Sequence, residues 1–190
     1  MGLNGVRQLG NEPWPRLKAR NGECGMTLTL RDSVHLVSDP GNLNSSVSEV
    51  FETMLGVGCE PIQSSASEFL IGGFESVTAV VGFGGILSGA CVIACKELSA
   101  RQIAGRMTGM DFDSVDDIVK DAIGEICNMI AGAWKCKVPE LAANCGLSVP
   151  AVITGRDYNL HVQSPEFKIF QVYKSDEAIF QVTIVCDGLL

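Results

Sequence analysis

The sequence predicts a two-layer α+β fold in which two long helices pack on one shared, mostly antiparallel β-sheet. Segments with helical periodicity alternate with strand-like segments, and each long helical segment is followed by several strands. A weak internal repeat supports the same arrangement. With 190 residues, 46% of them apolar, the chain can bury a sizeable core. We expect residues 1–40 to be a poorly ordered extension and residues 41–190 to form the domain.

The first half of the chain is expected to hold one long helix and several strands. Residues 26–38 have the pattern of a strand, and Met26 is a candidate for the true start. Asn44 or Ser45 can cap a helix that runs to about Leu55. Further strand patterns follow at residues 68–73, 76–82 and 87–96.

The second half begins with two helices and ends in strands. A short helix is predicted at residues 99–108, ending at Gly109. Ser114 is expected to cap a long helix that continues to about Lys135, with Asp117 close to a capping box. Strands are then predicted at residues 147–154, 158–162, 167–173 and 178–186, the last two joined in a hairpin that turns at residues 174–177.

The two long helices carry a weak internal repeat. Residues 49–56 (EVFETMLG) align with residues 125–132 (EICNMIAG), and several strands follow each segment. Such halves are typical of two helices on one sheet. Glu52 stands in the first copy where the second has Asn128, so only the second copy keeps a neutral hydrogen-bonding side chain there.

A glycine-containing apolar stretch raises two alternatives, a membrane span and a nucleotide loop. Residues 77–95 are uncharged over nineteen positions, which is the length of a membrane span. Glycines at 82, 84, 85 and 89 interrupt the stretch and favour two buried strands joined by a tight turn. A nucleotide loop is disfavoured because a strand pattern follows, leaving no helix N-terminus for a phosphate.

Charge and cysteine usage restrict the class of protein. The net charge of −8 argues against nucleic-acid binding, which usually needs a basic surface. The eight cysteines form no Cys-x-x-Cys pair and no Cys/His cluster, so we expect reduced core thiols and no metal site. The first thirty residues lack the apolar core of a signal peptide. We therefore expect a cytoplasmic protein that does not insert into membranes.

One face of the second long helix carries the candidate functional residues. Asp121, Glu125 and Asn128 fall within a sector roughly 60° wide at 100° per residue. Gly124 and Gly132 lie on the same side, and each costs about 1 kcal/mol in a helix interior. These glycines indicate an exposed, flat surface that another molecule can approach closely. The opposite arc is expected to be buried: Val115, Val119, Ala122, Ile123, Ile126, Met129, Ile130, Ala133 and Trp134.

An asparagine and a carboxylate one turn apart suit a limited chemistry. The Asn128 amide both donates and accepts hydrogen bonds without charge, which makes it a poor base but a good positioner of water. Phosphoryl transfer needs little beyond such positioning and charge neutralisation. A carboxylate such as Glu125 can hold a lysine of a partner protein. The simpler interpretation, a solvated helix face without a role, applies to any amphipathic helix.

The pattern Asp121-x-x-x-Glu125-x-x-Asn128, followed after twenty-one residues by Pro150, resembles the CheC/CheX/FliY chemotaxis phosphatases, and CheX most. The resemblance covers about residues 40–187. It implies a substrate, the aspartyl phosphate of a CheY-like response regulator, whose Mg²⁺ belongs to the regulator, so that the chain needs no cofactor of its own.

The resemblance also assigns roles to the motif residues. Asn128 would orient the attacking water and Glu125 would pair with the regulator's lysine, while Asp121, Gly124, Gly132 and Pro150 would form the partner-binding face. Relatives with two sites have Asn at the position of Glu52. The resemblance therefore implies a single site in this chain, the one on the second long helix. The family also suggests a homodimer. The alternative is a non-catalytic CheX-like adaptor that binds a response regulator or a flagellar switch component.

Overall fold

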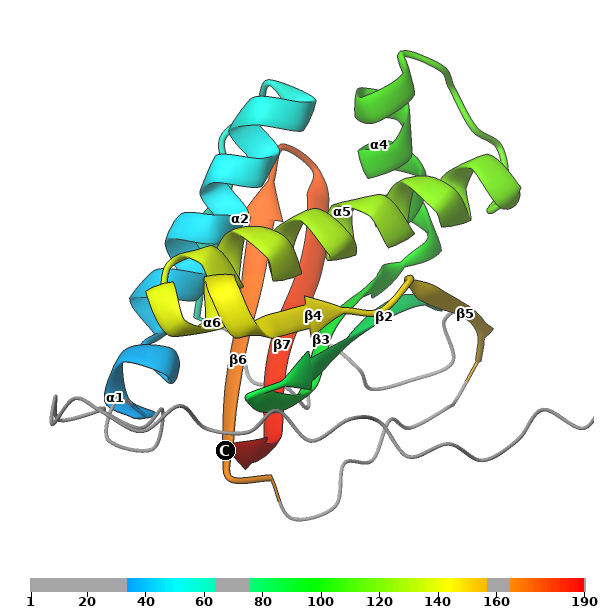
Figure 1. The fold of residues 1–190 in the computed structure, drawn as a ribbon. Helices are drawn as coiled ribbons and strands as arrows, with labels where there is room; N and C mark the ends of the chain where they lie inside the picture. Colours follow the sequence, from blue (N-terminus) through cyan, green and yellow to red (C-terminus); the bar gives the residue numbers. More distant parts are fainter. Residues whose placement is uncertain (1–33, 64–75, 157–164, 190) are drawn as a thin grey trace, which may run out of the picture.

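Helices cover one face of a single antiparallel sheet in the computed structural model, which describes residues 34–63, 76–156 and 165–189 (Figure 1). The helices are α1 (Val34–Val37), α2 (Pro40–Leu55), α4 (Glu97–Thr108), α5 (Asp117–Cys136) and α6 (Pro139–Asn144). The strands are β1 (Glu60–Ile62), β2 (Ser76–Gly85), β3 (Leu87–Lys96), β4 (Cys145–Leu147), β5 (Ala151–Gly155), β6 (Phe167–Ser175) and β7 (Ala178–Leu189). The predicted two-layer α+β class, with α2 and α5 on one sheet, is confirmed.

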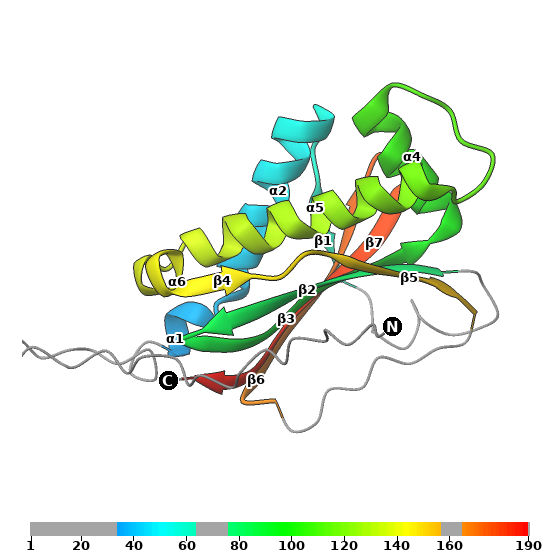
Figure 2. The ribbon, with the colours of Figure 1, turned by 45° about the vertical axis from the view of Figure 1, so that its right-hand side comes forward.

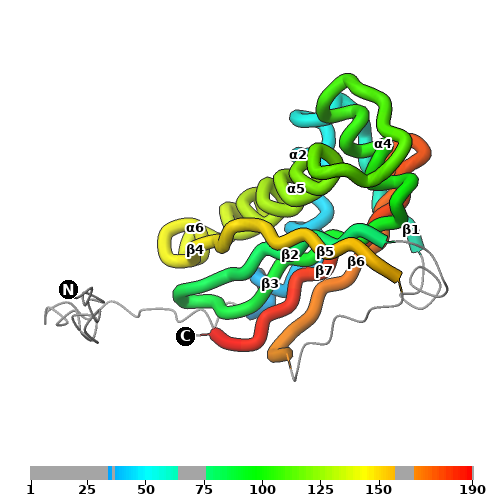
Figure 3. The backbone as a smooth tube through the Cα atoms, turned by 90° about the vertical axis from the view of Figure 1, so that its right-hand side faces the viewer, coloured from blue at the N-terminus to red at the C-terminus, as the bar shows by residue number. Residues whose placement is uncertain are grey.

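The sheet has the strand order β1-β6-β7-β3-β2-β4, and β5 also pairs with β2. All pairs are antiparallel, as in β2 with β3 and β6 with β7. Both β4 and β5 pair with β2 and run beside α5 (Figure 2). The tube drawing shows this segment below α5, along the side of the sheet where β2 lies (Figure 3). The chain segment that lies along α5 is therefore β4 and β5, which follow α5 in the sequence.

The glycine-containing stretch forms the predicted pair of strands, with its turn later than expected. The first strand was predicted to end at Gly82 but continues to Gly85, because residues 83–85 pair with β4. Gly85 has φ +117, and a Cβ there would lie 2.2 Å from the carbonyl oxygen of Asn144. Only glycine fits that turn. In the described part of the chain, no helix has the length and apolar content needed to cross a bilayer.

Both long helices begin at caps other than the predicted ones. The carboxylate of Asp39 accepts a hydrogen bond from the Gly41 N–H at 2.8 Å and caps α2. The predicted caps Asn44 and Ser45 are therefore wrong, since α2 starts four or five residues before them. For α5 the cap is Asp116, which accepts from the Val119 N–H at 2.9 Å, in place of Ser114. The predicted end of the shorter helix is confirmed, since Gly109 ends α4 in the left-handed conformation (φ +73).

Several strand predictions need correction or fall outside the described residues. Residues 34–37, predicted as part of a strand, form helix α1. The predicted strand at residues 147–154 is divided into β4 and β5, and the short helix α6 before it was missed. The predicted strands at residues 68–73 and 158–162 lie outside the described residues. The β6–β7 hairpin is confirmed and is longer than predicted.

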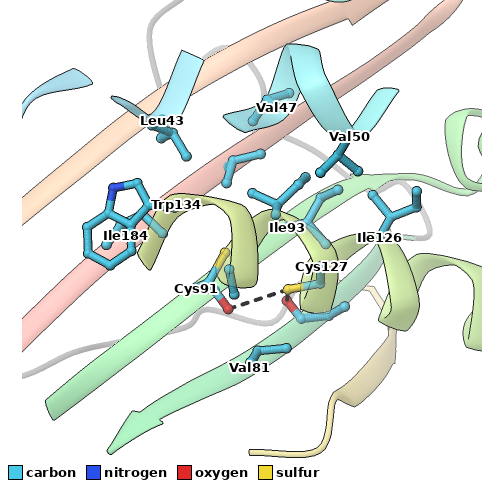
Figure 4. Packing of buried hydrophobic residues seen from close by; sticks show 14 of the residues in the cluster. Leu43, Val47, Val50, Val81, Cys91, Ile93, Ile126, Cys127, Trp134 and Ile184 are labelled. Atoms are coloured by element: carbon cyan, nitrogen blue, oxygen red, sulfur yellow. Dashed lines mark hydrogen bonds between the residues drawn. The ribbon is translucent and has the colours of Figure 1, made fainter. Parts of the chain in front are cut away.

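The core lies between the helices and the sheet (Figure 4). Phe51 on α2 stacks on Phe180 of β7 with ring centroids 4.7 Å apart, and Trp134 on α5 lies 5.2 Å from Phe83 of β2. Most of the predicted apolar arc of α5 is buried, while Val115, Met129 and Ala133 are half-buried against the core. Because α5 is fixed along its length, it is a rigid platform for the side chains on its other side.

Candidate functional site on helix α5

The predicted polar residues lie together on the outer side of α5. Asp121 and Glu125 are exposed, and Asn128 is half-buried. Among the described residues, neither Glu125 nor Asn128 has a side-chain hydrogen bond or ion pair. The Asn128 side chain is not among those with a buried polar atom that lacks a partner, so its amide can meet water or a visiting protein as far as the described residues are concerned. These two positions are the only part of the α5 surface that offers a neutral amide beside a carboxylate one turn away.

Gly124 corrects the prediction of an open, flat helix face. Its position is buried, and a Cβ there would lie 3.3 Å from Cβ of Pro150 and from Cγ2 of Val152. At Gly132, which is half-buried, a Cβ would lie 3.9 Å from Cδ1 of Leu147. The segment from β4 to β5 of the same chain therefore packs against both glycines. Pro150 lies against Gly124 immediately before β5, and its expected contact with a partner stays a prediction.

The residues between β4 and β5, residues 148–150, form a strap along α5 that hydrogen bonds hold in place. The Ser148 N–H donates to the Gly82 carbonyl at 2.9 Å, and Ser148 Oγ accepts from the Gly82 N–H at 2.8 Å. Lys135 Nζ donates to the carbonyl of Cys145 at 2.7 Å, which fixes the start of β4 to α5. Sequence analysis missed Ser148, and it gave Lys135 as the end of the long helix without its bond to β4. The usable signal was Pro150, because proline is disfavoured inside a central strand.

The corresponding surface of α2 is built differently. Glu49, which aligns with Glu125, forms an ion pair of 2.7 Å with Lys137 just after α5. Glu52, which aligns with Asn128, accepts a hydrogen bond from Ser48 at 3.0 Å. Gly56 ends α2 with φ +66, whereas Gly132 lies inside α5. The repeat is therefore visible in the placement of the two helices, but α2 lacks the free carboxylate–amide pair of α5.

Beneath the site, cysteines serve as packing groups. Cys127, next to Asn128, directs its Sγ at the carbonyl oxygens of Ala79 and Cys91, each at 3.6 Å (Figure 4). The pKa of Cys91 is raised by a hydrogen bond with Cys127 and by burial, and burial raises the pKa of Cys95 to about 12. Both thiols stay protonated at neutral pH. Six of the seven described cysteines are buried free thiols, as predicted, and Cys136 is exposed.

The two glycines give a matched test of how the strap sits on the helix. Gly124→Ala is expected to push Pro150 and Val152 away by a few tenths of an ångström. This overpacking should lower the free energy of unfolding by about 1 kcal/mol or more. Gly132→Ala meets only an ordinary contact and is expected to be neutral or to stabilise by up to about 1 kcal/mol. Urea unfolding followed by circular dichroism measures both. Equal effects of the two substitutions would contradict the difference in packing.

Comparisons with known proteins identify the family of this chain. The family model described as "Chemotaxis phosphatase CheX" matches residues 77–174, just over half of the chain. A curated relative, "CheY-P phosphatase CheX" of Thermotoga maritima, is 29% identical over 123 residues, which cover 62% of this chain and 78% of that protein.

Two solved structures show the same fold. A CheC-like superfamily protein from Shewanella sp. PV-4 has a TM-score of 0.64 and 23% identity, covering 78% of this chain and 97% of that one. The CheX–CheY–BeF₃–Mg²⁺ complex from Borrelia burgdorferi gives a TM-score of 0.57 and 20% identity, covering 80% and 99%. Since the family model spans more than half of the sequence, the chain belongs to the chemotaxis phosphatase CheX family.

Proposed function

We propose that this chain accelerates hydrolysis of the aspartyl phosphate of a CheY-like receiver domain, with Asn128 orienting the attacking water. The observation that carries the proposal is the outward pair Glu125 and Asn128, one turn apart on a rigid helix and unengaged by any described residue. Family membership and the names of the relatives support the substrate class. One relative is called a CheY-P phosphatase, and another was solved in complex with CheY.

The chemistry needs only what such a pair provides. Hydrolysis of an acyl phosphate requires a water molecule in line with the phosphorus–oxygen bond, and most of the catalysis is positioning and charge stabilisation. The Asn128 amide can accept from that water and donate to a phosphoryl oxygen without changing charge. Glu125 would pair with a lysine of the receiver, and Asp121 would support the same face. The Mg²⁺ would be the receiver's, so the chain supplies no cofactor.

The setting of the reaction follows from its substrate. Receiver domains of response regulators are cytoplasmic, so the enzyme would act there. The homodimer suggested by the family resemblance remains a prediction, which multi-angle light scattering of the full chain tests.

The direct test is phosphate release from a panel of phosphorylated receiver domains of the same genome. We expect the chain to accelerate release from at least one of them above the receiver's own rate. If the chain binds a phosphorylated receiver without accelerating its hydrolysis, it is an adaptor and the proposed activity is wrong. Co-purification with motor components, again without acceleration, would instead indicate a flagellar switch subunit.

A further inference from the structure

We infer that Val149 is a docking residue whose side chain contacts the receiver domain beside its phosphorylated aspartate. The inference rests on the proposed function and adds a residue that determines affinity for the partner. Val149 is 88% exposed, more than any other large apolar residue in the described part of the chain. A single exposed apolar side chain is common and needs no explanation by itself. Its rigidity and position are what distinguish Val149.

The backbone around Val149 is fixed on both sides. The preceding residue, Ser148, is bound to Gly82 by the two hydrogen bonds described above, and its Oγ also donates to the Val149 carbonyl at 2.9 Å. The following residue, Pro150, packs against Gly124 of α5. An exposed side chain on a backbone held this way pays little conformational entropy when a partner covers it. Val149 is thus presented in one place before any partner arrives.

The strap carries Val149 along the stretch of α5 that holds Asn128. Gly124, Asn128 and Gly132 follow one another at intervals of four residues, so they form a single stripe along α5 with a rise of about 12 Å. Leu147 lies at the Gly132 end of this stripe, and Pro150 lies at the Gly124 end. Three extended residues cover about 10 Å, which matches that rise. The residues between them, Ser148 and Val149, therefore lie beside the turn that carries Asn128.

This position determines what covers Val149. A receiver whose acyl phosphate reaches the Asn128 amide must bring its surface over the neighbouring part of the strap. The polar groups of α5 would then meet the charged active site of the receiver, while Val149 would meet an apolar part of its rim. Apolar anchors next to a polar centre commonly carry much of the affinity of an interface. The occupant of this surface is therefore the receiver domain itself.

The test measures binding separately from turnover. Titration calorimetry with a beryllofluoride–Mg²⁺-activated receiver from the panel gives Kd without hydrolysis. Val149→Asp is expected to weaken binding about tenfold or more, because a buried carboxylate would face an apolar rim, and Val149→Ala is expected to weaken it less. In turnover assays, Val149→Asp should raise KM and leave kcat unchanged. Because the side chain is exposed, both variants should unfold at the wild-type urea concentration.

Leu98→Asp is the matched control. Leu98 is also exposed, at 58%, but it lines a separate pocket with Phe51 and Asp176, so its substitution should leave Kd unchanged. An unchanged Kd in Val149→Asp would overturn the inference even if the chain is a phosphatase. Wild-type binding without any acceleration would refute the proposed function, while the effect of Val149→Asp on Kd would still decide the inference. A wild type that binds no activated receiver would overturn the docking role.

Discussion

Asn128→Ala is expected to remove the acceleration of receiver dephosphorylation, with a loss of about 100-fold or more in the catalysed rate. Loss of one hydrogen-bonding group that acts on the transition state typically costs about 10²–10³ in kcat. The Asn128 side chain bonds to no other described residue, so its truncation leaves no buried partner unsatisfied. Binding of the activated receiver should stay largely intact, because the amide is expected to position the water rather than to anchor the partner. Stopped-flow decay of the phosphorylated receiver measures the rate.

Glu52→Ala is the control for this substitution. Glu52 occupies the aligned position on α2 and is exposed, but it stands beside no asparagine and next to an ion-paired Glu49. Its removal should leave the catalysed rate at the wild-type value. An Asn128→Ala variant that dephosphorylates the receiver as fast as the wild type would exclude the water-positioning role. A parallel loss of binding would instead show that the amide anchors the partner.

The outward placement of Glu125 and Asn128 could be predicted because it depends only on the helical period. Residues 117–136 repeat apolar side chains at helical spacing, and burying that arc leaves the two polar residues outside. The N-caps of α2 and α5 were harder to predict. For α5, Ser114 and Asp116 are both good capping residues. Arg101 donates to the carbonyls of Phe112 and Asp113, and this contact between segments helps to fix where the loop ends. For α2, Pro40 was an available signal of an earlier start.

The strap shows what the period of one helix cannot predict. Gly124 and Gly132 correctly indicated a close contact with α5. The glycines do not indicate whether that contact is made by another protein or by a segment of the same chain. The answer depends on pairing of β4 and β5 with β2, some seventy residues earlier in the chain. Such pairing is set by tertiary packing and by a turn at Gly85 that only glycine fits. The exposed position of Val149 follows from the same pairing, so it could not be found before the fold was known.

Trp134→Ala is expected to lower the free energy of unfolding by about 3–5 kcal/mol. Trp134 is 1% exposed and its ring is tilted by 44° against Phe83 of β2, so it joins the C-terminal half of α5 to the sheet. Truncation would leave a cavity between the two layers, at a cost that is a large share of the 5–15 kcal/mol typical of a domain. Urea unfolding followed by far-ultraviolet circular dichroism gives the value. Trp134→Phe keeps an aromatic ring beside Phe83 and should cost less.

The two substitutions separate the chemistry of α5 from its support. In Trp134→Ala, dephosphorylation should fall as the folded fraction falls, and the molecules that remain folded should keep Asn128 in place. In Asn128→Ala, the urea midpoint should stay at the wild-type value while the rate is lost, because a half-buried amide without described partners contributes little to stability. A Trp134→Ala protein that loses less than about 1 kcal/mol would contradict the packing of α5 on β2. A large shift of the urea midpoint in Asn128→Ala would show that the amide is structural, and its effect on rate would then not report on water positioning.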